Sequence, residues 1–134
     1  MKSLIVEDDF TARKLMQVYL SDMGESFFAV NGKEAVEAVK EAFEKKDPFD
    51  LICMDIMMPE MDGIEAVKII RQMEKENGIE GLSRVKIVMT TAKGQSKDIL
   101  DAFNTGCEAY LLKPVRKPAL MKELERLGLF QNQS

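Results

Sequence analysis

Hydrophobic positions along this chain follow two alternating patterns. Short apolar runs, typical of buried β-strands, cover residues 3–6, 26–30, 50–54, 85–89 and 109–112. Between these runs, apolar residues recur at spacings of three and four, as Met16, Tyr19 and Met23 do in the first such stretch. This spacing places apolar side chains on one face of an α-helix. The sequence therefore predicts five strands, each followed by a helix.

Local signals mark the ends of several of these helices. Asn31 and Asp62 each stand three residues before a Glu, which is the spacing of a helix-capping box. The fourth helix is expected at residues 96–104, where the sequence is more polar, with Ile99 and Phe103 facing inward. These signals agree with the hydrophobic pattern about where strands give way to helices.

An unbroken alternation of strands and helices favours one architecture. It predicts an α/β protein, in which helices cover both faces of a parallel sheet. Because crossover connections are almost always right-handed, the simplest topology is a doubly wound five-stranded sheet with strand order 2-1-3-4-5. In that order the chain reverses direction between the first and third strands, and ligands bind outside the carboxyl ends of the strands at such a point.

Length, charge and composition narrow the class of protein. The 134 residues fit a single domain, expected over residues 1–134. The net charge of −4 argues against direct binding of nucleic acid, and the absence of histidine excludes His-based metal sites and catalytic triads. Two cysteines, Cys53 and Cys107, are too few for a disulfide framework, and no apolar run approaches the about 18 residues of a membrane span. We therefore expect a cytoplasmic protein without a membrane contact.

Polar side chains gather at the carboxyl ends of the predicted strands. They are Glu7 and Asp8 after the first strand, Asp55 after the third, Thr90 and Thr91 after the fourth, and Lys113 after the fifth. Three carboxylates close together would hold protons unless a cation lay between them. Oxygen ligands without His or Cys favour Mg²⁺ or Mn²⁺ over zinc. A carboxylate beside such a cation, a lysine and a hydroxyl group is suited to accept a phosphoryl group.

The residues at these positions resemble the motifs of one family. VEDD at 6–9, MDIMMPEMDG at 54–63, VMTTA at 88–92 and AYLLKP at 109–114 agree in order and spacing with the CheY-like receiver domain of bacterial two-component response regulators. The resemblance spans essentially the whole chain. It implies a flavodoxin-like fold and a stand-alone receiver without an output domain, which acts as a phosphorylation-activated signalling switch.

The resemblance also implies a role for each polar residue. Asp55 would be the phosphoacceptor, forming a 4-aspartylphosphate; Glu7, Asp8, Asp55 and the backbone carbonyl of Met57 would bind Mg²⁺; Thr91 would hydrogen-bond the phosphoryl group, Lys113 would pair with it, and Tyr110 would be the aromatic switch residue. In the family the Lys-Pro bond is cis, so a cis Lys113–Pro114 bond is expected. The chain would catalyse only its own phosphoryl transfer and slow autodephosphorylation, and is not expected to be an enzyme.

The implied partners follow from the same resemblance. A sensor histidine kinase or a phosphotransfer protein would donate the phosphoryl group. A downstream protein would bind the face formed by the fourth helix, fifth strand and fifth helix, with Lys97, Tyr110 and Lys122 as contacts. The chain itself is expected to be a monomer or a weak dimer.

Several residues near the motifs have a structural or tuning role instead. Asp9 is expected to cap the first helix, and Thr90 to support the site without contacting the phosphoryl group. Met57 and Lys93 occupy positions that vary in the family and tune dephosphorylation, and neither side chain can accept a proton from an attacking water. Residues 74–84 form a segment longer than in minimal receivers, expected as a loop before the fourth strand.

Other functions need sequence features that differ from those present. A haloacid dehalogenase-type phosphatase also combines Asp, Lys and Mg²⁺, but it carries an Asp-x-Asp motif after the first strand, where this chain has contiguous acids. A flavodoxin-type electron carrier needs a Ser/Thr/Gly-rich phosphate loop at the same place. A P-loop motif is absent from the sequence. A receiver that acts without phosphorylation remains open, although such proteins usually lose part of the site.

Overall fold

The computed structural model describes residues 1–58, 60–92 and 96–130 of the chain. Five parallel strands form one sheet in the order β2-β1-β3-β4-β5. The strands are β1 (Lys2–Val6), β2 (Glu25–Ala29), β3 (Leu51–Asp55), β4 (Lys86–Thr91) and β5 (Ala109–Leu112). The α-helices are α1 (Phe10–Leu20), α2 (Gly32–Glu44), α3 (Gly63–Glu76), α4 (Ser96–Thr105) and α5 (Lys117–Arg126), and two short 3₁₀ turns are η1 (Ser21–Met23) and η2 (Gly81–Ser83). The predicted doubly wound α/β fold and its strand order are confirmed.

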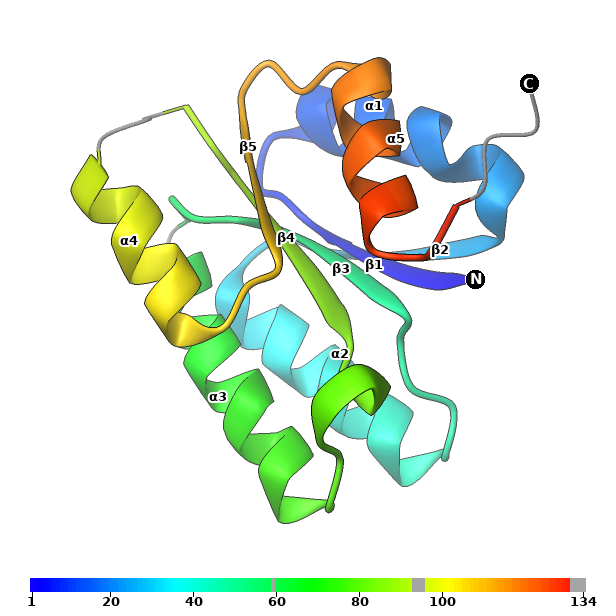
Figure 1. Ribbon diagram of the computed structural model, residues 1–134, viewed down its shortest axis with the longest axis vertical. Coiled ribbons are helices and arrows are strands. Elements are labelled where there is room, and N and C mark those ends of the chain that lie inside the picture. The colour runs from blue at the N-terminus through cyan, green and yellow to red at the C-terminus, as the bar shows by residue number, and fades with distance from the viewer. Residues whose placement is uncertain (59, 93–95, 131–134) are drawn as a thin grey trace.

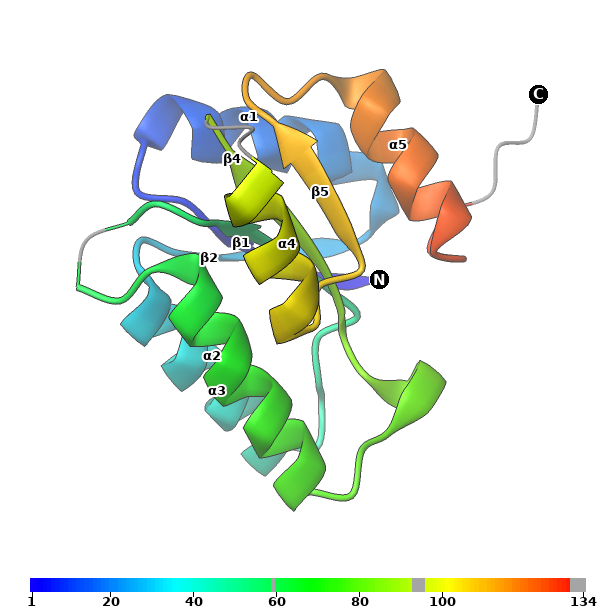
Figure 2. The same cartoon turned by 60° about the vertical axis from the view of Figure 1, so that its left-hand side comes forward.

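The helices cover the sheet on both faces. Helices α1 and α5 lie on one face, and α2, α3 and α4 lie on the other (Figure 1). Figure 2 shows the same division after rotation, with α4 in front of the edge formed by β5. Successive strand residues point to opposite faces, so Leu4 belongs to the core under α2 and α3 while Ile5 belongs to the core under α1 and α5. Within the described ranges, no helix is both long and apolar enough to cross a membrane.

The expected helix caps are present at three helices. The side chains of Asp9, Asn31 and Asp62 each accept a hydrogen bond from the backbone N–H group three residues later, at 2.8 Å in every case. These bonds satisfy N–H groups that have no partner inside the helix. Asp9 therefore caps the amino end of α1, as the sequence predicted.

The structure differs from the sequence prediction in the fourth helix. Phe103 was expected to face inward, but the residue is 47% exposed, whereas Ala102 is completely buried. The core-facing stripe of α4 passes through Ile99 and Ala102, so Phe103 lies at its margin. The prediction for Phe103 was wrong because a three- and four-residue spacing does not distinguish the centre of a helix face from its edge.

The segment 74–84 leads into β4 as a loop, as expected, with its first residues in α3 and the η2 turn within it. Helix α3 continues to Glu76, and the chain then passes through Asn77 and Gly78 into the η2 turn. Gly78 has a φ of 72°, a left-handed conformation that glycine adopts without a steric penalty. The segment lies at the amino end of β4, away from the polar residues at the carboxyl ends of the strands.

Arg71 of α3 joins this segment to the start of β5. Its guanidinium group donates to Glu74 Oε1 at 2.6 Å and to Glu108 Oε1 and Oε2 at 2.7 and 2.9 Å. It also donates to the backbone carbonyl oxygens of Gly106 and Val85. The side chain of Glu74 is only 1% exposed, so its charge depends on Arg71 for neutralisation. This network fixes α3 against the turn that leads into β5.

Replacing Arg71 tests this network. Arg71→Ala leaves the buried Glu74 carboxylate without its cation, and removal of one partner from a buried pair costs about 3–5 kcal/mol. We expect that loss in the free energy of unfolding measured by urea denaturation. The control, Lys45→Ala, removes an exposed pair with Glu41 and should leave the denaturation midpoint nearly unchanged. Equal effects of the two substitutions would contradict the structural role of Arg71.

Candidate functional site

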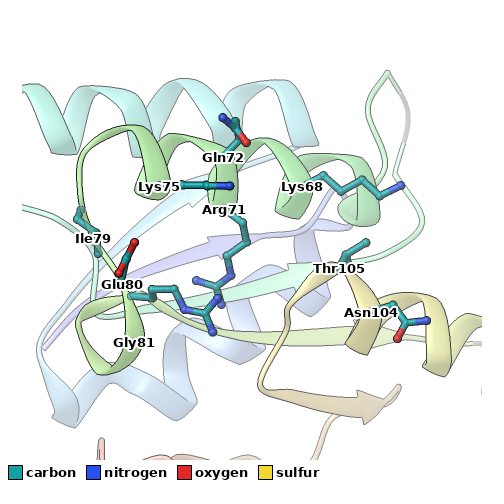
Figure 3. A pocket seen from close by; sticks show the side chains of 10 residues that line it. Lys68, Arg71, Gln72, Lys75, Ile79, Glu80, Gly81, Asn104 and Thr105 are labelled. Carbon is teal, nitrogen blue, oxygen red and sulfur yellow. The ribbon is translucent and has the colours of Figure 1, made fainter.

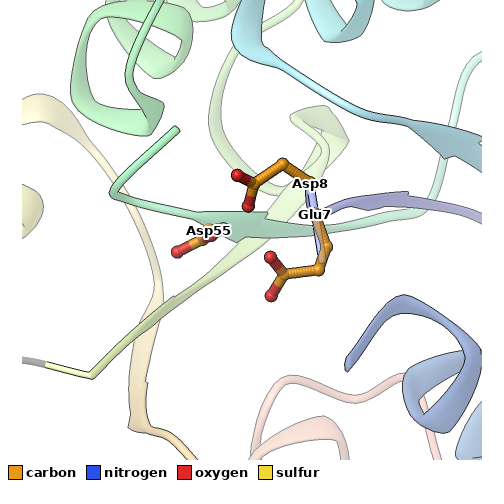
Figure 4. Close-up of side chains that lie close together, drawn as sticks. All are labelled: Glu7, Asp8 and Asp55. Atoms are coloured by element: carbon orange, nitrogen blue, oxygen red, sulfur yellow. The ribbon is translucent and has the colours of Figure 1, made fainter. Parts of the chain in front are cut away.

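Three carboxylates meet where β1 and β3 end. The two strands are hydrogen-bonded neighbours, with Val6 paired to Met54, so Glu7 and Asp8 emerge beside Asp55. One carboxylate oxygen from each acid lies within 4.8 Å of the other two (Figure 4). Glu7 and Asp55 are only 4% and 3% exposed, whereas Asp8 lies at the surface. The sequence prediction that these three acids come together is confirmed by the geometry.

Lys113 supplies the positive charge of the cluster from the loop after β5. Its Nζ atom donates to Glu7 Oε1 and lies 3.1 Å from Asp55 Oδ2. The backbone N–H group of Lys113 donates to the carbonyl oxygen of Thr91 at 2.8 Å, which anchors this loop to the end of β4. The Lys113–Pro114 bond is cis, as expected. Lys113 therefore reaches across the end of β4 to contact acids from two other strands.

Burial and mutual repulsion change how these groups bind protons. Burial raises the pKa of Glu7; the hydrogen bond from Lys113 opposes this rise, and the Asp55 carboxylate adds to it. Burial also raises the pKa of Asp8, and the adjacent Glu7 adds to that rise. Burial alone would lower the pKa of Lys113, but its contacts with Glu7 and Asp55 outweigh burial and raise that pKa. Glu7 and Asp8 are therefore harder to deprotonate than ordinary carboxylic acids, and Lys113 is harder to deprotonate than an ordinary lysine.

These shifts have opposite consequences for stability at neutral pH. The folded state binds the Glu7 and Asp8 protons more tightly than the unfolded state does. The stabilising contribution of these acids is therefore complete below their unfolded pKa values and is lost as the pH rises through the raised folded values. The contribution of Lys113 persists until the pH passes its raised pKa, above the ordinary value of 10.5. Near pH 7 the lysine stabilises the site, and the paired acids weaken it.

The ligand atoms in the cluster suit a hard divalent cation. All of them are carboxylate oxygens, and Mg²⁺ prefers oxygen ligands supplied by one or two carboxylates together with water. A divalent cation would also relieve the repulsion that raises the pKa values of Glu7 and Asp8. The carboxylates of this cluster therefore fit Mg²⁺.

Two threonines end β4 beside the cluster. Thr90 pairs with Asp55 across the sheet, and its carbonyl oxygen accepts a hydrogen bond from the Ile56 N–H group at 2.9 Å. This contact supports the expected structural role of Thr90. Thr91 is the last residue of β4 and is 1% exposed. Tyr110 lies in the neighbouring strand β5, where it pairs with Met89 of β4, and it is half-buried.

Met57 and Lys93 were the two positions expected to tune dephosphorylation. Met57 is 55% exposed, and the backbone N–H group of this residue donates to Asp55 Oδ1 at 3.3 Å. The side chain of Met57 is thus accessible beside the acid cluster, and its carbonyl group as a metal ligand stays a prediction. Lys93 lies outside the described residues.

Two residues that the sequence did not single out also shape the site. Arg13 of α1 donates to the carbonyl oxygen of Glu7 at 2.9 Å and so fixes the chain where it leaves β1. Gly63 packs so closely that an added Cβ atom would lie 2.3 Å from the carbonyl oxygen of Asp55. The capping motif at Asp62 predicted the start of α3, but the sequence held no signal for this close approach. Both contacts concern the backbone, which a motif of side chains does not report.

The three contiguous acids after β1 divide into two roles. Glu7 and Asp8 belong to the cluster, whereas the side chain of Asp9 caps α1. The Asp9 N–H group donates to Glu7 Oε2 at 3.2 Å, so the helix start also orients a member of the cluster.

This division provides a matched test of the metal site. With Mg²⁺ at about 100 times its Kd, binding to the folded state stabilises it by about 2.7 kcal/mol. Asp8→Asn should remove most of that Mg²⁺-induced rise in Tm while raising the Tm of the metal-free protein, because one of three like charges is lost. The control Asp9→Asn keeps a capping side chain and should keep the full Mg²⁺ response. Equal Mg²⁺ responses in the two variants would exclude Asp8 as a ligand.

Comparison with known proteins places this geometry in a family. The model of the response regulator receiver domain matches residues 3–125. The chemotaxis protein CheY of Bacillus subtilis is 34% identical over 125 residues, covering 92% of this chain and 93% of that protein. A hybrid signal transduction histidine kinase B of Dictyostelium discoideum is 41% identical over 129 residues, which cover 92% of this chain. The chain spans only 6% of that kinase's length.

A solved structure agrees with the fold and with the expected metal. The receiver domain of the histidine kinase CKI1 from Arabidopsis thaliana, in complex with Mg²⁺ and BeF₃⁻, aligns with a TM-score of 0.80 and 30% identity. The alignment covers 95% of this chain and 89% of that one. Together with the acid cluster, these comparisons support Mg²⁺ binding. The chain belongs to the response regulator receiver domain family.

Proposed function

We propose that the chain is a phosphorylation-activated signalling switch that works with Mg²⁺, and that Asp55 is its phosphoacceptor. The observation that carries the proposal is the nearly buried Asp55 carboxylate, held 3.1 Å from the Lys113 ammonium group at the carboxyl edge of the sheet. The donor would be the phosphohistidine of a sensor histidine kinase or a phosphotransfer protein, or a small phosphodonor. The similarity of the chain to part of a histidine kinase supports a donor of this class.

The residues of the site suit the chemistry of that transfer. An oxygen of Asp55 would attack the phosphorus atom while the bond to the donor nitrogen breaks, and the product would be an aspartyl phosphate. Lys113 would neutralise charge on the phosphoryl oxygens, and the Thr91 hydroxyl group would donate to one of them. Positioning and charge neutralisation supply most of the catalysis in phosphoryl transfer, so no additional base is needed.

Glu7, Asp8 and Asp55 would hold the metal ion, with the carbonyl oxygen of Met57 as a further ligand. When bound, Mg²⁺ supplies positive charge that stabilises the transferring phosphoryl group. Mn²⁺ should substitute, because it accepts the same oxygen ligands. Lys113 would then exchange part of its pairing with Glu7 for contact with the phosphoryl group.

The signal would leave through α4, β5 and α5. Phosphorylation would draw Thr91 toward the phosphoryl group and let Tyr110 pack inward, a shift between two populated states. Leu100, Phe103 and Leu112 expose apolar surface on α4 and β5, which a downstream protein would bury. Lys97 and Lys122 are exposed on α4 and α5 and would contribute charged contacts at the rim of that face.

The catalytic scope, oligomeric state and location of the chain complete the proposal. We propose that the chain turns over no substrate besides its own phosphoryl group, and that it acts as a monomer or weak dimer. A cytoplasmic location fits its two cysteines, which are both free and buried. Burial raises the pKa of Cys53 to about 12 and that of Cys107 to about 11, so neither thiol is reactive at neutral pH.

Chemical phosphorylation tests the proposed acceptor. Incubation with acetyl phosphate and Mg²⁺ should give an acid-labile adduct that peptide mapping by mass spectrometry assigns to Asp55. Asp55→Asn should abolish the adduct, because an amide is not a nucleophile toward phosphorus. The control Asp62→Asn, which keeps the α3 cap, should be phosphorylated like the wild type. An undiminished adduct in Asp55→Asn would refute the assignment.

The exposed Met57 side chain predicts a long-lived phosphoryl group. An apolar chain at this position would cover the phosphoryl group, and it cannot orient an attacking water. Met57→Asn should therefore speed autodephosphorylation about tenfold, equivalent to roughly 1.4 kcal/mol of barrier. Loss of the phosphoryl group is followed in excess Mg²⁺, with Leu82→Asn as a control at an exposed residue of η2. An unchanged rate for Met57→Asn would show that Met57 does not shield the site.

A further inference from the structure

A polar groove lies between α3, η2 and the carboxyl end of α4, apart from the acid cluster (Figure 3). Its volume is about 480 Å³, within the range of about 300–1,000 Å³ that small-molecule sites occupy. None of the acids of the cluster lines it. The lining residues are Lys68, Arg71, Gln72, Lys75, Ile79, Glu80, Gly81, Arg84, Asn104 and Thr105.

The groove is basic although the chain is acidic. Four lining residues are basic and one is acidic, against a net charge of −4 for the whole chain. Lys68 and Lys75 stand seven residues apart on α3, two turns along the same helix face, so their backbones are about 10 Å apart. Both are exposed, and neither forms an ion pair with any residue in the described part of the chain. Their charges are available to a ligand.

The floor of the groove combines a fully paired arginine, Arg71, with an arginine that has an unsatisfied donor, Arg84. Arg71 is held by Glu74 and Glu108 and by two backbone carbonyl groups, so it shapes the floor without offering free charge. Arg84 lies beside it, with Nη2 3.8 Å from Glu108 Oε1. The Nε atom of Arg84 is buried and has no hydrogen-bond partner. Such groups are rare in folded proteins, and an anion seated in the groove would be attracted to this incompletely paired guanidinium group.

Glu80 limits which anions fit. Figure 3 shows its carboxylate next to Ile79 at the end of the groove opposite Lys68 and Thr105. A simple anion would be repelled at that end, whereas a ligand with hydroxyl groups could donate hydrogen bonds to Glu80 there. The lining therefore favours a molecule that is anionic at one part and a hydrogen-bond donor at another.

We propose that this groove binds a small phosphorylated molecule of the sugar phosphate or nucleoside phosphate class. Lys68, Lys75 and Arg84 contact the phosphoryl oxygens, and Glu80 accepts from a hydroxyl group of the sugar. Lysine and arginine are the side chains that proteins use most for phosphate, as a point charge and as a planar donor respectively. The site is independent of Asp55, so ligand binding requires neither Mg²⁺ nor phosphorylation.

Titration with AMP, followed by amide chemical shifts of the full chain without Mg²⁺, tests the proposal. Saturable shifts should centre on residues 68–75, 80–84 and 104–105. The double variant Lys68→Glu/Lys75→Glu should weaken AMP binding by about tenfold or more, because two attractive charges become repulsive. Glu80→Gln should strengthen binding of inorganic phosphate, since it removes the repulsive charge from the groove.

A matched control distinguishes a specific binding site from general electrostatic attraction. Lys14→Glu/Lys117→Glu makes the same change in net charge at exposed residues of α1 and α5, on the other face of the sheet. It should leave AMP affinity within about twofold of the wild type. Equal weakening by the two double variants overturns the proposal, as do shifts centred on Lys113 or shifts that do not saturate. A preference for an acidic peptide over AMP at the same residues would also overturn it.

Discussion

The central constraint on this protein is that two nearly buried carboxylates from different strands share one lysine. The sheet order makes β1 and β3 neighbours, so Glu7 and Asp55 lie close together. The ammonium group of Lys113 contacts both carboxylates. Burial raises the pKa of Glu7, and the pKa of Lys113 is raised by its two acidic partners. Burial and the neighbouring Asp55 thus disfavour the ionised form of Glu7, while its contacts with Lys113 and with the Asp9 N–H group favour that form. A divalent cation or a phosphoryl group changes that balance directly, which is what a switch requires.

The rest of the fold holds these groups in position. The close approach of Gly63 to the carbonyl oxygen of Asp55 sets the path of the chain after β3, and Arg13 does the same after β1. On the far side of α3, Arg71 ties that helix to the turn before β5. The strand end that carries Asp55 and the strand that carries Tyr110 are thus both fastened to α3. A rearrangement at the acid cluster consequently has a packed element through which it can reach the α4–β5 face.

Much of this arrangement could be predicted from the sequence, because it depends on rules of topology and local spacing. The strand order follows from repeated βα units, and that order alone brings Glu7, Asp8 and Asp55 together. The caps at Asp9 and Asp62 follow from the side-chain chemistry of residues that begin helices. The choice of Asp9 as the capping acid among residues 7–9 came from the family resemblance, since the counterpart of Asp9 varies in that family.

Other features could not be predicted, because they depend on distances between segments far apart in the chain. Arg71 and Glu108 are 37 residues apart and carry no spacing signal, yet Nη2 of Arg71 donates to both carboxylate oxygens of Glu108. The exposure of Phe103 depends on how closely α4 approaches the sheet through Ala102, which a helical period does not contain. The basic groove likewise joins residues of α3, η2 and α4 that look like ordinary surface charges in the sequence.

Phosphorylation of Asp55 should alter the α4–β5 face. Amide hydrogen exchange, compared between the unmodified and phosphorylated chain in Mg²⁺, is the most direct measurement of that effect. We expect altered protection in the segment after Asp55 and also in β4, α4 and β5, including the amide of Tyr110, with no such change in Asp55→Asn under the same treatment. Changes confined to the few residues that follow Asp55 would contradict it.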